Sequence, residues 1–283
     1  MKDRKVLNIQ TAINFIENNI DKKLSLCMIA QALNYSKYHL HRMFNEVLGM
    51  TIHEYIQRRQ LTEAAKWLIF SKKSIIDIAI LCGYESQQAF TLVFKEMYKE
   101  TPAVYRRRGI FYPLQLRFNL YDKEEKKFSL KDIRLAKFED IPIWLELVKM
   151  VISGYPNFNK VDYLIKLKNC IIEKRALILK DGNIAIGIMA FSYETNNIEF
   201  WGVHPQYKKE NIAYKFLKKL IIDFLPEKNI SITTYRENDK ADIGYRDEIK
   251  QLGFIEKELL IEYGYPTQRF VFKGMNINVK NEL

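Results

Sequence analysis

"IAQALNYSKYHLHRMFNEVLGMTIHEY", residues 29–55, returns in altered form as "IAILCGYESQQAFTLVFKEMYKETPAVY", residues 78–105. The two stretches match at an offset of 49 residues as far as Tyr35. After one inserted residue they match at an offset of 50 from Ser36 onward. Two copies are too few for a solenoid. The repeat therefore predicts one small structural unit that is used twice.

Each copy has the pattern of a helix, a tight turn and a second helix. Apolar residues recur at helical spacing on both sides of the turn. Asn34 in the first copy and Gly83 in the second tolerate the left-handed backbone that a tight turn needs. Ser36 and Ser86 stand where helix N-caps are wanted. This order predicts two helix-turn-helix units.

The connector between the copies, "TIHEYIQRRQLTEAAKWLIF" at residues 51–70, has the pattern of one long amphipathic helix. At a rise of 1.5 Å per residue it spans about 30 Å. One turn of DNA is about 34–36 Å long. A rigid helix of this length would place two recognition helices in successive major grooves, so that one chain does what usually needs a dimer.

The charge of the chain is concentrated in this front part. The net charge is +11 over 283 residues, and residues 1–108 hold 17 Lys+Arg against 10 Asp+Glu, a net of +7. Such an excess indicates a polyanionic partner. The alternative, a merely soluble basic protein, stays open on charge alone.

The cysteines and the apolar runs suggest a compartment. Cys27, Cys82 and Cys170 lack the spacing of metal ligands or redox pairs, which predicts no metal site and buried free thiols in a reducing compartment. The start "MKDRKVLNIQ" lacks the apolar core of a signal peptide. No apolar run reaches the ~18 residues that cross a membrane. The expected location is the cytoplasm, without a membrane partner.

Four stretches carry a family resemblance: "LSLCMIAQALNYSKYHLHRMF", "RRQLTEAAKWL", "SIIDIAILCGYESQQAFTLVFK" and "TPAVYRR". Through them residues from about 8 to 108, within an expected domain at 1–108, resemble the DNA-binding domain of the AraC/XylS family of transcription regulators. The resemblance implies an all-α, seven-helix, double helix-turn-helix domain that binds two adjacent major grooves of double-stranded DNA. A contact with RNA polymerase is also expected of such a regulator.

The resemblance also assigns residues to the DNA contact, namely Lys37, Tyr38, His41, Arg42, Gln87, Gln88 and Thr91. An arginine pairs in bidentate fashion with guanine, a glutamine suits adenine, and a threonine contacts a thymine methyl or a phosphate. Leu92 stands where some relatives carry arginine. For Arg58, Arg59, Lys72 and Lys73, phosphate contact and a solvated charged face both stay open.

A linker at 109–128 is expected to lead into a second domain at 129–283. The expected elements there are a strand at 131–138, helices at 139–153 and 162–174, a hairpin at 175–193 around Asp181-Gly182, a strand at 196–203, a helix at 211–225, a strand at 228–235, a helix at 241–254 and strands at 255–265 and 267–274. This order predicts a mixed α/β (α+β) domain.

The segments "VHPQYKKENIAYKFL", at 203–217, and "LGFIEKELLIEYGYPTQRFVFK", at 252–273, resemble those of the GNAT acyltransferase fold. The resemblance implies a mixed, mostly antiparallel sheet with acetyl-CoA as cofactor. Loop N–H groups and a helix N-terminus would hold the pyrophosphate. The residues assigned to the cofactor are Trp201, Val203, Lys208, Lys209, Glu210, Asn211, Ile212 and Ala213.

Two of these positions depart from the family pattern, namely Lys208 in place of the usual Arg or Gln and Asn211 in place of glycine. Asn211 stands where glycine is usual, and Asn tolerates a left-handed backbone but adds bulk near the phosphate. Glu210 adds a like charge beside a diphosphate, which Lys208 and Lys209 offset. Weakened coenzyme A binding is therefore one expectation for this chain, and loss of that binding is the other.

The chemistry of acetyl transfer needs a base and an acid. Glu199 lies on the strand where the family often carries a glutamate base, and strict alternation places it on the same side as Trp201. A plain surface carboxylate is the equal alternative. The family's tyrosine acid is replaced by Ile249, and Tyr245 lies one helical turn earlier as a substitute.

Three functions for the second domain follow from the sequence. It acetylates a small amine, it is a non-catalytic module that senses coenzyme A or another ligand and controls the DNA-binding domain, or it is an unrelated effector-binding module. The V-x-P loop and the Gly-Phe segment argue against the third.

Overall fold

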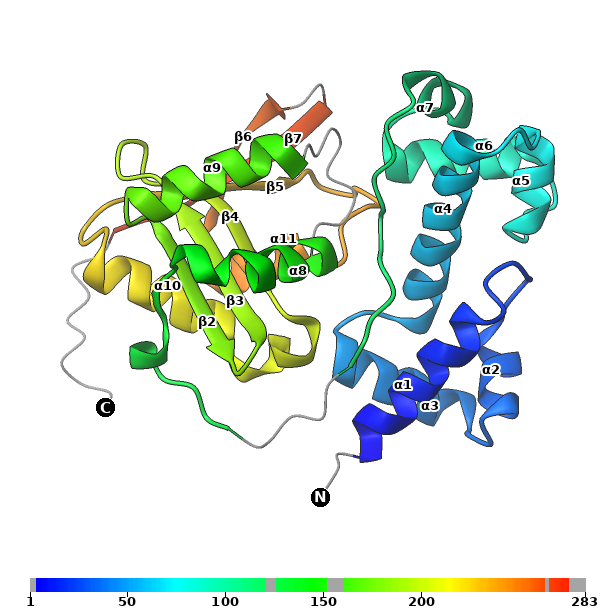
Figure 1. The fold of residues 1–283 in the computed structure, drawn as a ribbon, viewed down its shortest axis with the longest axis horizontal. Helices are drawn as coiled ribbons and strands as arrows, with labels where there is room; N and C mark the ends of the chain where they lie inside the picture. The colour runs from blue at the N-terminus through cyan, green and yellow to red at the C-terminus, as the bar shows by residue number, and fades with distance from the viewer. Residues whose placement is uncertain (1–3, 121–125, 152–159, 263–264, 275–283) are drawn as a thin grey trace. The chain divides into compact units, whose positions relative to one another are not determined.

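The computed structural model describes residues 4–120, 126–151, 160–262 and 265–274. The chain divides into two compact units, here the first unit (residues 1–127 with 149–158) and the second unit (residues 128–148 with 159–283). Figure 1 draws the helices of the first unit and the sheet of the second.

Seven helices lie in residues 4–108 of the first unit, as predicted. They are α1 (Arg4–Glu17), α2 (Leu26–Ala32), α3 (Lys37–Leu48), α4 (Ile52–Phe70), α5 (Ile75–Leu81), α6 (Gln87–Tyr98) and α7 (Pro102–Arg108). The long helix α4 joins the group α1–α3 at one end to the group α5–α7 at the other (Figure 1). Its 19 residues give a length of about 28 Å.

The two helix-turn-helix units form as the sequence predicts. Asn34 and Gly83 adopt the left-handed backbone at the two turns, with φ of 56° and 78°. The Ser36 hydroxyl accepts the His39 N–H at 3.2 Å, and the Ser86 hydroxyl accepts the Ala89 N–H at 3.1 Å. Each recognition helix, α3 and α6, therefore begins at a capped and defined residue.

The loop between α1 and α2 ties the two helix-turn-helix units together. A Cβ placed on Gly83 would lie 3.3 Å from the Cα of Lys23, so the second turn packs closely against this loop. The Lys23 ammonium pairs with Glu85 at 3.1 Å, and the Gln60 amide of α4 donates to the Lys22 carbonyl at 3.0 Å. These contacts act together with helix α4 to fix the distance between α3 and α6.

Residues 109–120, here called the strap, run alongside α4 (Figure 1). Tyr112, Leu114 and Phe118 are buried, and Phe118 stacks on Tyr55 of α4 with ring centroids 5.5 Å apart. The Thr62 hydroxyl of α4 accepts the N–H groups of residues 114 and 115, both at 3.1 Å. The first part of the segment predicted as a linker is therefore packed onto the first unit.

The second unit contains one mixed sheet. Its elements are η1 (Leu130–Asp132), β1 (Arg134–Leu135), η2 (Phe138–Asp140), α8 (Ile141–Val151), α9 (Lys160–Ile172), β2 (Ala176–Asp181), β3 (Ile184–Phe191), β4 (Asn197–Val203), η3 (Pro205–Glu210), α10 (Ile212–Asp223), β5 (Ile230–Tyr235), α11 (Tyr245–Gln251), β6 (Ile255–Glu262) and β7 (Tyr265–Phe272). The strand order is β1-β2-β3-β4-β5-β7-β6, and among these described strands only the β4–β5 pair is parallel. The predicted order of elements and the mixed, mostly antiparallel sheet are both confirmed.

The sheet carries helices on both faces. Helix α10 packs so closely over β3 that a Cβ on Gly187 would collide with the Phe216 ring. On the opposite face, Tyr163 of α9 meets Phe200 of β4 edge to face at 5.6 Å. The β2–β3 hairpin forms as expected, but its two loop residues are Gly182 and Asn183, one position later than the Asp-Gly pair.

Candidate functional site

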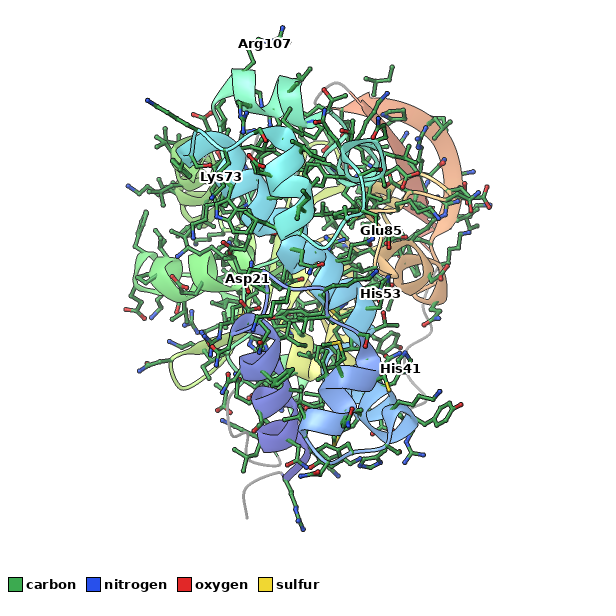
Figure 2. The ribbon with its side chains drawn as sticks, turned by 90° about the vertical axis from the view of Figure 1, so that its right-hand side faces the viewer. Asp21, His41, His53, Lys73, Glu85 and Arg107 are labelled. Carbon is green, nitrogen blue, oxygen red and sulfur yellow. The ribbon has the colours of Figure 1, made fainter. Side chains whose placement is uncertain are left out.

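The outward face of α3 presents the residues that the sequence predicts for DNA. Lys37, Tyr38 and Arg42 are exposed and His41 is half-buried. Tyr38 keeps 77% of its surface exposed, with the Lys37 ammonium 5.0 Å from its ring centroid. In Figure 2, His41 of α3 and Glu85, just before α6, project to the same side of the first unit.

The outward face of α6 presents the second predicted set. Gln87 and Gln88 are exposed and Thr91 is half-buried, while Phe90 and Phe94 fill the core beneath them. Among the described residues, the core of the first unit contains neither of the exposed amides of Gln87 and Gln88. The two outward faces therefore keep polar side chains exposed.

Arg58 and Arg59 are neither phosphate contacts nor part of a solvated face, so both expectations for them are wrong. Their exposed fractions are 1% and 6%. The Arg59 guanidinium donates to Glu17 at 2.8 and 2.7 Å and to the carbonyl of Gln115 at 3.1 Å. These arginines lock α4 to α1 and to the strap. Their helical phase with buried Tyr55 was the sequence signal for burial.

The sheet of the second unit opens between β4 and β5. These two strands, described in full, pair only at their first residues, Asn197 with Ser231 and Ile198 with Ile232. Beyond that point β4 stays paired with β3, and β5 stays paired with β7 as far as Tyr235. The divergence, here called the strand opening, leaves the later part of β4 facing no strand on that side.

The loop after β4 forms η3 and then feeds α10. Asn211 takes the left-handed backbone that glycine usually supplies, with φ 55° and ψ 28°, and it directly precedes the first residue of α10. Ala213 and Ile212 are buried against the sheet, whereas in η3 Lys208 and Glu210 are half-buried and Lys209 is exposed. The backbone N–H groups that start α10 therefore emerge next to Asn211.

The structure brings Lys208 and Tyr245 together, although they lie on different elements. The Lys208 ammonium sits 4.9 Å from the centroid of the Tyr245 ring, and that ring lies 6.4 Å from the ring of Tyr235 at the end of β5. Burial raises the pKa of nearby Glu248, and the charge of Lys208 opposes that rise. The loop and α11 therefore meet at the mouth of the strand opening.

Glu199 does not share a side with Trp201, so that expectation is wrong. Ala190 of β3 pairs with Phe200 and Phe191 pairs with Ile198, which leaves Glu199 as the extra residue of a β-bulge. The bulge breaks strict alternation and turns its carboxylate to the α9 side.

There the Glu199 carboxylate is engaged. Arg175 donates to Oε2 at 2.6 Å, and the Cys170 thiol of α9 lies 3.8 Å from the same oxygen. Burial raises the pKa of Cys170 to about 11. No sequence pattern indicates the Arg175 contact, because the pairing of β2, β3 and β4 brings Arg175 and Glu199 together.

Other predicted residues take structural positions. Trp201 and Val203 belong to the apolar cluster of the sheet, and the buried Trp201 Nε1 has no hydrogen-bond partner among the described residues. Ile249 is buried. Asp242 accepts the N–H groups of residues 244 and 245, which caps the start of α11. Burial raises the pKa of Asp242, and the hydrogen bonds from these N–H groups oppose that rise.

The thiols are free, as expected, but not all are buried. Cys82 and Cys170 are buried and Cys27 is exposed on α2, which corrects the expectation for Cys27. In the described ranges, no helix combines the length and apolarity that a membrane crossing needs. The same ranges hold no group of three His, Cys, Asp or Glu residues that could bind a metal ion.

Comparison with known proteins finds relatives of the first unit among helix-turn-helix proteins. A family model described as a helix-turn-helix domain matches residues 29–108. The regulatory protein SoxS of Salmonella typhimurium is 43% identical over 100 residues, which cover 35% of this chain and 94% of that protein. The right origin-binding protein of Escherichia coli K12 is 36% identical over 141 residues, 48% of this chain and 46% of that protein. This chain thus aligns with about half the length of the latter relative.

For the second unit, a solved structure offers a weaker likeness. The crystal structure of a GNAT-family acetyltransferase from Bacillus cereus ATCC 10987 covers 50% of this chain and 96% of that one, at 17% identity and a TM-score of 0.39. At these values the likeness supports no conclusion about chemistry.

Proposed function

Since the chain belongs to the AraC family of helix-turn-helix regulators, we propose that it reads two adjacent major grooves of double-stranded DNA and so regulates transcription. Domains of this family bind double-stranded DNA. The observation that carries the proposal is the pair of capped recognition helices, α3 and α6, whose outward polar residues take no part in the core. The rigid connection through α4 and the loop before α2 suits a fixed half-site spacing.

The test is selection of binding sites from a pool of random duplexes by the full chain. We expect enriched sites with two half-sites about one helical turn apart and an affinity that falls steeply with salt. Arg42→Ala is expected to relax base preference in one half-site and Gln88→Ala in the other. Lys66→Ala, an exposed change on α4, serves as the control and keeps both preferences. A pool without enriched sequences would overturn the proposal.

For the second unit we propose binding of a coenzyme A thioester as a regulatory ligand at the strand opening. Three features support the fit: the left-handed Asn211 before α10, the Lys208 and Lys209 ammonium groups on η3, and the buried N–H of Trp201, which has no hydrogen-bond partner in the part of the chain that the structure describes. The first N–H groups of α10 with these lysines would hold the pyrophosphate. The unpaired edge of β4 would receive the pantetheine arm.

The thioester would supply an activated acetyl group, but the surrounding residues favour binding over turnover. The Glu199 carboxylate is turned to Arg175 and Cys170. Ile249, which is buried and apolar, stands where GNAT acyltransferases carry their tyrosine acid. Amine acetylation is the second candidate, favoured by one observation. Glu199 is the residue at which β4 leaves β5, and its side chain retains 42% exposure.

Calorimetry with acetyl-CoA on the full chain tests both candidates. Binding with no turnover of an amine panel supports the sensor, and turnover that Glu199→Gln abolishes supports the enzyme. Absence of heat at high micromolar acetyl-CoA would remove both. Asn211→Gly keeps the left-handed backbone and removes side-chain bulk, so it is expected to tighten binding. Asn211→Val places a β-branched residue at positive φ and is expected to weaken it.

A further inference from the structure

The two recognition helices of this chain differ sharply in chemistry at equivalent positions. The internal offset of 50 residues pairs the outward set of α3 with that of α6. The pairs are Lys37 with Gln87, Tyr38 with Gln88, His41 with Thr91 and Arg42 with Leu92. The first set holds two permanent cations, a histidine and an aromatic ring, whereas the second set carries no charge. The two half-sites are therefore read by different kinds of contact.

Leu92 is the residue that marks this difference most clearly. It stands at the position of Arg42 in the repeat, and 61% of its surface is exposed. It lies four residues after exposed Gln88, so both share one face of α6. The core side of the helix is already filled by Phe90 and Phe94, whose rings meet at 5.5 Å. Leu92 thus takes no part in the core.

The major groove offers an apolar group that suits such a residue. Each thymine presents its C5 methyl group there, and apolar side chains contact it. Glutamine pairs with adenine in the same groove. Gln88 and Leu92 together therefore suit A·T pairs, the glutamine at the adenine and the leucine at the thymine methyl. Arginine at the equivalent position of α3 is instead suited to guanine.

We propose that Leu92 is a specificity-determining residue that reads a thymine methyl in the half-site contacted by α6. This inference rests on the proposed DNA-binding function. The half-site of α3 is read by cationic side chains, and that of α6 by amide and methyl contacts. The operator is therefore asymmetric, with thymine required at one or two positions of the α6 half-site. Most of the salt dependence that the two helices contribute comes from α3.

The test uses the duplex that the full chain selects from the random pool. The α6 half-site is assigned as the one whose base preference changes in Gln88→Ala. Each thymine there is then replaced by deoxyuridine, which keeps the pairing edge and removes only the C5 methyl. For the unaltered chain we expect about fourfold weaker binding at one or two positions, the effect of one buried methyl group. Leu92→Ala is expected to bind the thymine and deoxyuridine duplexes equally.

A second variant guards against an uninformative loss of binding. Leu92→Arg restores the charge seen in the first copy, so we expect a new preference for guanine in the α6 half-site and a salt slope steeper by about one. Circular dichroism establishes that both variants fold. An α6 half-site without a sensitive thymine, equal sensitivity in Leu92→Ala, or an unchanged preference in Leu92→Arg would each overturn the inference. These outcomes leave DNA binding intact, whereas a pool without enrichment ends both proposals.

Discussion

Replacing Arg59 with alanine removes the centre of a buried network in the first unit. The guanidinium makes two hydrogen bonds to Glu17, at 2.8 and 2.7 Å, and one each to Glu63 and to the Gln115 carbonyl, both at 3.1 Å. The side chains of Arg59 and Glu17 are only 7% and 9% exposed. Arg59→Ala leaves the Glu17 carboxylate buried with the Tyr55 hydroxyl, which donates to it at 2.7 Å.

The expected cost follows from the asymmetry of buried ion pairs. Removing one partner leaves an uncompensated buried charge and costs about 3–5 kcal/mol. The control is Lys66→Ala on the same helix, because Lys66 is 57% exposed and pairs with Glu63 at 3.6 Å. An exposed pair of that kind contributes about 0–1 kcal/mol. The double variant Glu17→Gln with Arg59→Met leaves no unpaired charge and is expected to recover part of the loss.

Hydrogen–deuterium exchange of the full chain reports these differences locally. A loss of about 3 kcal/mol corresponds to exchange faster by more than a hundredfold in the protected amides of α4 and the strap. The Lys66→Ala control is expected to change the same amides by less than about fivefold. Equal exchange rates in Arg59→Ala and Lys66→Ala would refute the view that this network holds the strap and α1 to α4.

Three further predictions concern single side chains. Burial opposes ionisation of Asp140, but hydrogen bonds from Arg134, the Lys137 N–H and Lys180 leave its pKa lowered. The folded state therefore holds the proton less tightly than the unfolded chain does. The stability that the ionised carboxylate contributes is present above about pH 4. Acid titration of unfolding is expected to show that stability lost as the pH falls through the lowered pKa, and Asp140→Asn to lack this loss. Gly187→Ala pushes a methyl into the Phe216 ring of α10, so urea unfolding is expected to show about 1–3 kcal/mol of destabilisation. Adding Phe216→Leu is expected to relieve this loss. A double variant as unstable as Gly187→Ala would contradict the close packing of α10 on β3. Ser86→Ala removes the cap of α6 and is expected to cost about 1 kcal/mol in thermal unfolding, unlike the exposed change Glu96→Ala on the same helix.

Much of the fold could be predicted because its signals are local. Serine caps, left-handed Asn34 and Gly83, and apolar spacing on α4 are properties of a few neighbouring residues, and each appears in the structure as expected. The order of strands and helices in the second unit follows from periodicity in the same way. The residues predicted for DNA on α3 and α6 are exposed or half-buried, because the phase of a helix alone sets which of its residues face outward. Their contact with DNA stays a prediction.

The errors arose where distant segments meet. The burial of Arg58 and Arg59 does not follow from the helix pattern alone, because the strap residues that cover them are 56 residues away in the chain. Alternation along the strand places Glu199 on the same side as Trp201, but alternation holds only without a bulge, and the bulge depends on the pairing of β3 with β4. Cys27 was expected to be buried by residue type, yet its position on α2 faces outward.

The sequence by itself determined that this protein has two helix-turn-helix units joined by one helix, followed by a mixed α/β domain, because caps, turns and periodicity act over a few residues. Only the tertiary structure decided which charges are buried, where β4 leaves β5, and that Lys208 lies against Tyr245. Those outcomes depend on the register and packing of segments far apart in the chain. The hydrogen bonds and the desolvation that arise between such segments cannot be predicted from the pattern of any single stretch of sequence.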